Sequence, residues 1–201
     1  ARVGQLVCKH GSLATPATLV YTRRGGPLCM TPDLLAKMQP TCGVQIDVLQ
    51  FLAGPDPATL SSFGKGAHAY LALPEGTTLV ATNRDPTMYE YGARPNTEAG
   101  VYATIHAGGV VASVEKYMSA VAALQPDLYV TLCDEITLPD AKPKRNTTSV
   151  TRTLKWLEGC LAAHSAQGVP PHTGALAAVA GAGSAEERAR AAIEWRGGGG
   201  G

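Results

Sequence analysis

The sequence predicts one α/β domain in which parallel strands alternate with helices. From about residue 113 onward, helical and strand patterns alternate, with connections long enough for parallel crossover units. Residues 128–133 (LYVTLC) form a nearly continuous apolar run, as expected of a strand covered on both faces. The 201 residues are 45% hydrophobic and 16% charged, which fits a globular domain with a sizeable core. A doubly wound sheet and a (β/α)8 barrel both satisfy this alternation.

The first hundred residues predict short strands, loops and one short helix. Strand patterns lie at residues 3–7 and 17–21, and the second is closed by the turn at 23–27. A helix is predicted at 32–38, because Thr31 can cap it and Pro32 suits its first position. Residues 42–52 mix strand and helix signals and are left unassigned. Further strands are predicted at 69–73 and 78–81.

The second half carries longer and more periodic patterns. Residues 101–106 and 110–112 predict a hairpin around a glycine turn at 107–109. Ser113 caps a helix that Pro126 ends, and strand 128–133 follows. The order is completed by a helix at 147–163, a strand at 175–180 and a last helix. This last helix begins with the capping box at Ser184 and ends near Trp195. Residues 1–196 are thus one domain, and 197–201 are a glycine-rich tail.

Composition restricts the classes of function. The formal charge of +1, from 17 basic and 16 acidic residues, gives no global footprint of a nucleic-acid binder, so any RNA binding must be local or shared with a partner. Five widely spaced cysteines fit free thiols in a reducing compartment. No run approaches the roughly 18 apolar residues of a membrane span, so no integral membrane segment is expected. The expected location is the cytoplasm. The five histidines show no ligand spacing, and no metal site is assigned.

Asp134 is the most informative polar position, because strand alternation ends an apolar row in this carboxylate. In α/β barrels, the carboxyl ends of strands form the mouth where ligands bind. A carboxylate there can accept hydrogen bonds from the ring N–H and exocyclic amine of a guanine-like base. The alternative is structural: Asp134 or Glu135 caps the next loop or pairs with Lys142, Lys144 or Arg145.

A basic cluster follows Asp134, and it consists of Lys142, Lys144, Arg145, Arg152 and Lys155. These side chains could contact RNA phosphates, and Lys142, Lys144 and Arg145 are the candidate RNA contacts. The alternative is a solvated helix start. No serine, cysteine or histidine set can be argued as a nucleophile, so no catalytic residue is assigned.

Several stretches together resemble the tRNA-guanine transglycosylase family. They span most of residues 4–195 and read GQLVCKHGSLATPATLVYT with LCMTPDLLAKM, GVYATIHAGGVVASVEKYM, LQPDLYVTLCDEITLPDAKPKRNTTSVTRTLKWLEGCLAAH and GALAAVAGAGSAEERARAAIE. The resemblance implies a (β/α)8 TIM-type barrel, here truncated to roughly its first half and carrying an N-terminal antiparallel β element. It also implies chemistry in which guanine at the tRNA wobble position is exchanged for a deazaguanine base.

Residue by residue, the resemblance is incomplete. Asp134 matches the base-recognising aspartate of the family. The family's Asp-Ser-Gly-Gly-Phe-Gln motif corresponds to VQIDVLQFLAGP, which lacks Ser-Gly-Gly, and the catalytic role is not transferred to Asp47. The family's Val-Gln-Gly-Gly corresponds to Val179, Ala180, Gly181 and Ala182, so the amide that reads the base is missing.

These losses resemble the non-catalytic accessory subunits of eukaryotic-type queuine tRNA-ribosyltransferases. The expected partners are a catalytic queuine tRNA-ribosyltransferase subunit, in a heterodimer, and tRNA. Zinc is expected only in a C-terminal part of the family's length that this chain does not reach, and the resemblance permits a peripheral association with the mitochondrial outer membrane. Two alternatives stay open: an active transglycosylase with a divergent pocket, and a truncated α/β binding module without a queuine role.

Overall fold

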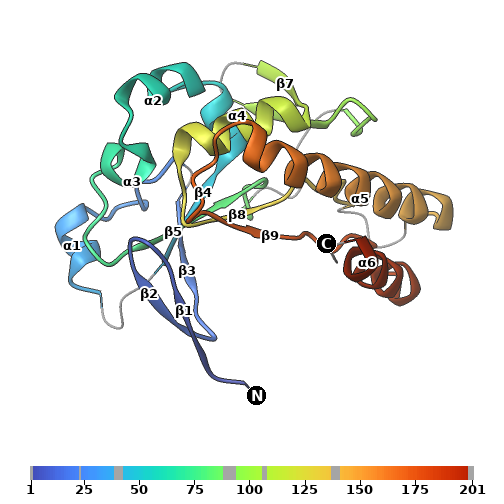
Figure 1. Cartoon of the computed structure of the whole chain (residues 1–201), viewed down its shortest axis with the longest axis horizontal. Helices are drawn as coiled ribbons and strands as arrows, with labels where there is room; N and C mark the ends of the chain where they lie inside the picture. The colour runs from blue at the N-terminus through green and yellow to red at the C-terminus, as the bar shows by residue number, and fades with distance from the viewer. Residues whose placement is uncertain are drawn as a thin grey trace.

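The computed structural model in Figure 1 describes residues 2–22, 24–38, 43–87, 94–105, 108–136 and 141–198. Its strands are β1 (Gly4–Val7), β2 (Ser12–Thr15), β3 (Leu19–Tyr21), β4 (Gly43–Asp47), β5 (Thr78–Thr82), β6 (Val101–Ile105), β7 (Gly108–Ala112), β8 (Leu128–Val130) and β9 (Gly174–Leu176). Its helices are α1 (Pro32–Ala36), the 3-10 helix η1 (Val48–Leu52), α2 (Pro57–Phe63), α3 (Gly66–Tyr70), α4 (Val114–Leu124), α5 (Pro143–Ala166) and α6 (Ala185–Gly198).

A five-stranded sheet in the order β3-β4-β5-β8-β9 forms the centre, and all of its pairings are parallel. In Figure 1, α2, α4 and α5 lie above this sheet, the antiparallel hairpin β1–β2 extends below it, and α6 lies to the right below α5. The second hairpin, β6–β7, is antiparallel and lies beside α4. The α/β class and the N-terminal antiparallel element are therefore as predicted. Among the described strands the sheet is open, with β3 and β9 at its edges.

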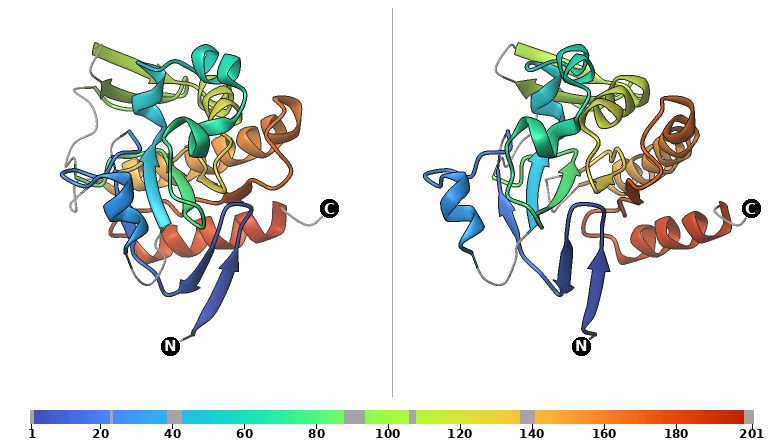
Figure 2. Two further views of the ribbon diagram at one scale, coloured as in Figure 1. Left: turned by 90° about the vertical axis from the view of Figure 1, so that its left-hand side faces the viewer. Right: turned by 60° about the vertical axis from the view of Figure 1, so that its left-hand side comes forward.

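The common direction of the central strands explains why polar groups gather at their amino ends and at their carboxyl ends. All five central strands run in the same direction, so their amino ends lie on one side of the sheet and their carboxyl ends on the opposite side. Figure 2 shows the molecule from two further sides. Loops that leave the carboxyl ends therefore meet each other, and so do the loops that enter the amino ends. A buried carboxylate lies at each of these two ends: Asp127 precedes β8 at the amino end, and Asp134 follows β8 at the carboxyl end.

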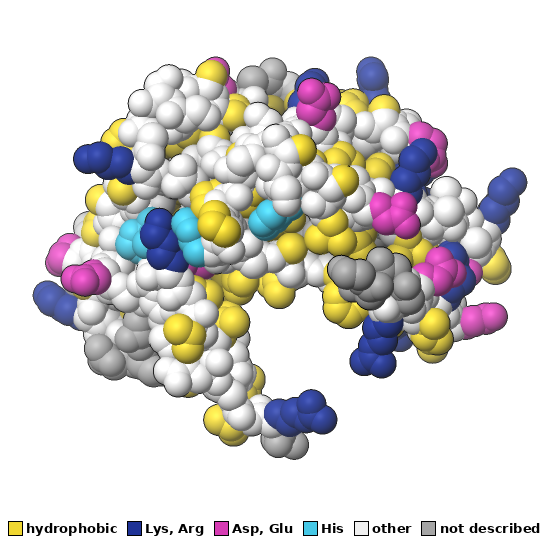
Figure 3. Space-filling model, in the orientation of Figure 1, with side chains coloured by type: hydrophobic (Ala, Val, Ile, Leu, Met, Phe, Trp, Pro, Cys, Tyr) yellow, Lys and Arg dark blue, Asp and Glu magenta, His cyan; other side chains and the backbone are white. Residues whose placement is uncertain are grey.

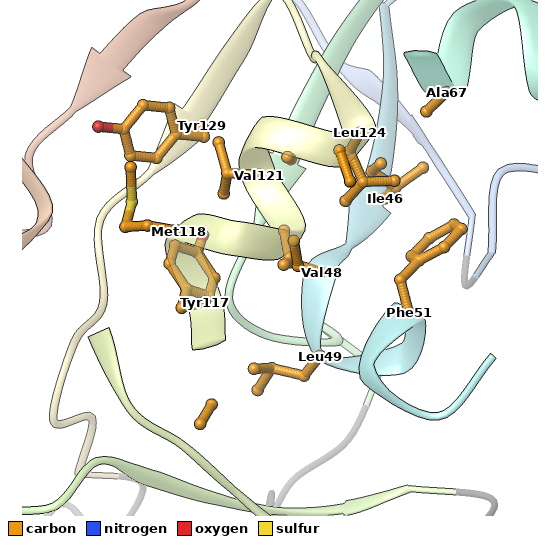
Figure 4. Close-up of a cluster of buried hydrophobic side chains, with 14 of the residues drawn as sticks. Ile46, Val48, Leu49, Phe51, Ala67, Tyr117, Met118, Val121, Leu124 and Tyr129 are labelled. Carbon is orange, nitrogen blue, oxygen red and sulfur yellow. The ribbon is translucent and has the colours of Figure 1, made fainter. Parts of the chain in front are cut away.

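The main hydrophobic core lies between the sheet and α4. Tyr117, Met118, Val121 and Leu124 recur at helical spacing on one face of α4, and all four are fully buried. Figure 4 shows them facing side chains from β4, η1 and β8, which include Ile46, Val48, Leu49 and Tyr129. Each such side chain contributes about 1.5–3 kcal/mol through removal of apolar surface from water. Helix α4 is thus held by its apolar face, as its sequence pattern predicts.

Three local predictions are corrected or completed. The strand predicted at 69–73 is wrong: residues 66–70 form α3, because a helical turn places Ala67 and Leu71 on the same core cluster. The mixed segment 42–52 holds both signals in succession, β4 followed by η1. The pattern at 17–21 belongs to the central sheet as β3, and β1 pairs instead with β2, which the sequence reading missed.

Several element bounds also move. Strands β8 and β9 are shorter than predicted, and α5 starts at Pro143, earlier than residue 147. Helix α6 extends to Gly198, so the first two residues of the glycine-rich tail continue the helix. The turn predicted at 107–109 begins outside the described residues. Within the described part of the chain, no helix combines the length and apolarity needed to cross a membrane.

Candidate functional site

A pocket of about 540 Å³ opens at the carboxyl end of the central sheet. In open α/β sheets, ligands bind outside the carboxyl ends of the strands. The lining residues come from β4, from β5 and β8 and the segments that follow them, from α5, from the loop between β9 and α6, and from α6. They are Gln45, Thr82, Asn83, Arg84, Pro86, Val130, Cys133, Asp134, Glu135, Ile136, Ser149, Ala178, Val179, Ala180, Gly181, Ala182 and Arg188.

Asp134 lies at this pocket, but its side chain is completely buried and its oxygens face other protein groups. Arg145 donates to both oxygens, from Nη1 to Oδ2 and from Nη2 to Oδ1, each at 2.7 Å. Arg152 donates from Nη1 to Oδ2 at 2.6 Å, and Asn96 donates from Nδ2 to Oδ1 at 2.8 Å. A bidentate arginine and two further donors therefore surround one carboxylate.

One face of α5 builds this arrangement. Arg145, Ser149, Arg152 and Thr153 are spaced at helical intervals, so their side chains project toward the same segment. The backbone N–H of Asp134 donates to Thr153 Oγ1 at 3.0 Å, and Ser149 Oγ donates to the Asp134 carbonyl at 2.5 Å. The main chain and the side chain of Asp134 are thus fixed by the same helix.

The electrostatics of Asp134 favour its ionised form. Burial by itself would raise the pKa of this carboxyl, but hydrogen bonds from Arg145 and Asn96, together with the charges of Arg145 and Arg152, hold the pKa below its usual range. Arg152 is shared, because its Nε also donates to Glu98 Oε1 at 2.9 Å. Two arginines and two carboxylates therefore form one charge network around α5.

The structure brings together only part of the set that the sequence singled out. Asp134 and Arg145 form the ion pair that was the structural alternative, so the Arg145 guanidinium is engaged inside the protein. Lys142 and Lys144 are exposed at the start of α5. The sequence reading did not find Asn96 as a partner of Asp134, because it lies 38 residues away in a segment rich in turn residues.

Asp47 also has a structural position. It ends β4, is 1% exposed, and its Oδ1 accepts from the backbone N–H of Leu49 at 3.0 Å, which caps η1. Val48 and Leu49 are fully buried, so this segment packs into the core where the family motif has Ser-Gly-Gly. The described contact of the Asp47 carboxylate is therefore the cap of η1.

Other groups at the pocket are matched to each other. Arg84 forms an ion pair with Glu135, and Asn83 Nδ2 donates to the Thr131 carbonyl at 2.8 Å. Burial raises the pKa of the Cys133 thiol to about 12, so the thiol is protonated at neutral pH and is a poor nucleophile. Among the described residues, no group of three or more His, Cys, Asp or Glu side chains could hold a metal ion.

The amino end of the central sheet carries a second polar cluster, which the sequence patterns did not predict. His10, from the loop between β1 and β2, stacks on His68 of α3 with ring centroids 4.4 Å apart, and His172 meets His10 edge-on at 6.3 Å. Asp127 accepts from the backbone N–H of His10 at 3.1 Å and faces its Nδ1 at 3.0 Å. Figure 3 shows histidine side chains reaching the surface of this face. Three segments far apart in sequence thus meet at this end of the sheet, and His10 contacts the Asp127 carboxylate.

This cluster predicts a pH-dependent stability. Burial, as the largest cause, lowers the pKa of His68 and of His172, and electrostatic repulsion from Lys9 and His10 lowers both further. The unfolded chain therefore binds more protons than the folded protein just below the usual histidine pKa of about 6.5, so this contribution to stability is complete above that pH and decreases as the pH falls. We expect the Tm to fall between pH 7.5 and 5.5.

Thermal denaturation across this pH range checks the expectation. In the double variant His68→Gln and His172→Gln, the slope of Tm against pH should flatten, while His164→Gln, a control on α5, should leave it unchanged. An unaltered slope in the double variant would show that other groups cause the pH dependence.

Comparisons with known proteins add to this geometry. A family model described as TGT: Queuine tRNA-ribosyltransferase matches residues 1–197. Proteins named queuine tRNA-ribosyltransferase accessory subunit 2 are similar to the chain: that of Trichoplax adhaerens is 26% identical over 196 residues, which are 96% of this chain and 52% of the relative. That of Ixodes scapularis is 30% identical over 84% of this chain and 42% of the relative, and that of Homo sapiens 27% over 89% and 43%. The chain spans about half the length of the curated relatives it matches.

Proposed function

Since the chain belongs to the queuine tRNA-ribosyltransferase family, with a match over residues 1–197, we propose that it is part of a non-catalytic accessory subunit of this enzyme. In this proposal the subunit supports the exchange of guanine for queuine at the wobble position of tRNA anticodons. The names of the similar proteins, which contain the words accessory subunit 2, support the assignment.

The observation that carries the non-catalytic role is the engagement of Asp134. The carboxylate that matches the family's base-recognising aspartate is surrounded by Arg145, Arg152 and Asn96. Asp47 caps η1, and Ala180 stands where the family has its base-reading glutamine. With the oxygens of Asp134 paired inside the protein and no amide side chain at position 180, we infer that the pocket no longer selects a guanine-like base.

We propose further that the sheet is the first half of a (β/α)8 barrel. Its five strands are all parallel, and among the described strands the two outer ones, β3 and β9, each pair on one side only. Leu176 of β9 and Val179 after it are 43% and 57% exposed, as expected of a sheet that continues. Figure 3 shows a hollow between the N-terminal hairpin and α6, with hydrophobic side chains along its upper rim. The relatives are about twice as long as this chain, which leaves sufficient length for a second half.

The proposed partners are a catalytic queuine tRNA-ribosyltransferase subunit and tRNA. Lys142 is the N-cap residue of α5 and Lys144 lies in its first turn; both are exposed, so their ammonium groups can reach RNA phosphates. The net charge of the chain is only +1, so tRNA affinity would come from the complex of two subunits. A zinc site would belong to the remaining length of the protein, and no step of the proposal uses residues of this chain as metal ligands. The complex is proposed to be cytoplasmic.

The test is a guanine-exchange assay of the full-length protein alone, the catalytic subunit alone, and their mixture, after co-purification of the two. We expect the subunits to co-purify and exchange to rise at least tenfold in the mixture above either chain alone. Robust exchange by this protein alone would mean an active transglycosylase with a divergent pocket. No co-purification and no effect on exchange would contradict the queuine role and favour a binding module.

The tRNA contact is tested in the same mixture. Lys142→Ala with Lys144→Ala should weaken tRNA binding and reduce the dependence of log Kd on log salt concentration, because two phosphate contacts are lost. Lys65→Ala with Lys116→Ala removes the same charge from the start of α3 and from α4, and is the matched control. Equal effects of the two double variants would show that only net charge matters.

A further inference from the structure

The acceptor capacity of Asp134 is completely used by the protein itself. An ionised carboxylate offers about four lone-pair positions. Two are filled by the parallel N–H groups of Arg145, one by Arg152 and one by Asn96, at distances between 2.6 and 2.8 Å. No position is left for a molecule from solution.

The two arginines differ in how firmly the fold holds them. The Arg152 side chain is 11% exposed, and it also donates to Glu98 and to the Asn96 carbonyl. The Arg145 side chain is 34% exposed, and its hydrogen bonds go to Asp134. Arg145 lies on the third residue of α5, one turn before Ser149, which lines the pocket. Arg145 is therefore the more exposed donor to Asp134, and Arg152 is the more buried one.

The geometry of Arg145 also defines what could replace it. A guanidinium presents two parallel N–H groups in one plane to the two oxygens of a carboxylate. A small planar molecule with two adjacent N–H groups presents the same donors. Asp134, held by Arg152, Asn96 and the backbone contacts of α5, would stay in place to receive it.

We propose that Arg145 is a built-in ligand of the Asp134 carboxylate, and that removing its guanidinium opens a binding site there for small planar molecules with two adjacent N–H groups, such as guanidinium or an amidine. Arg145 then determines the specificity of this carboxylate by keeping such molecules out. This inference rests on the proposed non-catalytic role, because it takes Asp134 as a carboxylate that does not have to bind a base.

The experiment measures whether free guanidinium restores what Arg145→Ala removes. The full-length variant should melt on the order of 5 °C below the natural protein. Guanidinium chloride at low millimolar concentration should raise its Tm in a saturable way, and sodium chloride at equal ionic strength should not. The natural protein, whose site is filled, should show no such rise. Titration calorimetry of benzamidine into the variant should report one site.

Two further variants keep the result interpretable. Arg145→Gln retains a single amide NH2 group and loses the paired N–H groups of the guanidinium. It is used if Arg145→Ala does not fold, with the same expected response to guanidinium. Adding Asp134→Asn to either variant should abolish the response, and Arg190→Ala, on α6, should show none. A flat response in both Arg145 variants, or an equal rise in the natural protein, would overturn the proposal. Because neither tRNA nor a catalytic subunit is present, this failure is distinguishable from failure of the accessory role.

Discussion

Asp134→Ala is expected to destabilise the protein by about 3–5 kcal/mol, because it removes one partner from a buried ionic network. Arg152 would keep a largely buried charge with only Glu98 as counter-ion, and Asn96 and Arg145 would lose their acceptor. For a chain of this size, the Tm should fall by about 6–20 °C. Urea denaturation at pH 7 gives the free energy of unfolding.

The loss of stability in Asp134→Ala shows whether Asp134 holds the fold together or is kept free to bind a base. A carboxylate kept free to bind a base is usually a cost to stability, so its removal would be neutral or stabilising. Glu135→Ala is the matched control, since it breaks the neighbouring ion pair with Arg84, in which both side chains are partly exposed, and should cost about 0–1 kcal/mol. If Asp134→Ala costs no more than Glu135→Ala, the network does not hold the fold, and the internal-ligand proposal loses its basis.

Asp127→Ala should have the second largest effect, at about 2–4 kcal/mol, because it leaves buried backbone donors without an acceptor. Asp127 Oδ2 accepts from the N–H of Leu79 at 2.8 Å, and Oδ1 accepts from the N–H of His10. The main chain of Asp127 bonds to Leu79 and Gly174. One residue therefore joins β5, β8, β9 and the N-terminal hairpin.

Hydrogen exchange together with chemical denaturation checks this second prediction. The amides of His10 and Leu79 should exchange faster in Asp127→Ala, while the amides of α4 should change only through the global loss of stability. Asp127→Asn keeps an acceptor and should cost less than Asp127→Ala. Asp33→Ala, at an exposed position on α1, should change stability by no more than about 0.5 kcal/mol. Unchanged exchange at His10 would show that the hairpin is held by other contacts.

The two carboxylates show how much of a site a sequence pattern can predict. The sequence pattern placed Asp134 at the end of a strand over 128–133, but β8 ends at Val130 and Asp134 lies in the segment that follows it. Its partners come from α5 and from the segment around Asn96, and only the docking of α5 against the sheet selects Arg145 over Lys142 or Lys144. Asp127 carried no signal in the sequence, because its significance depends on His10, His68 and His172 meeting at one edge.

The sequence by itself determined the α/β class, helices α4, α5 and α6, strand β5 and the end of a strand near Asp134. Apolar periodicity and capping act within one element, so local residues are sufficient to specify them. The tertiary structure decided that residues 66–70 form a helix, that β3 joins the central sheet, and that the Asp134 carboxylate is already occupied. These outcomes depend on which surfaces pack together, and packing joins residues that are tens of positions apart in the chain.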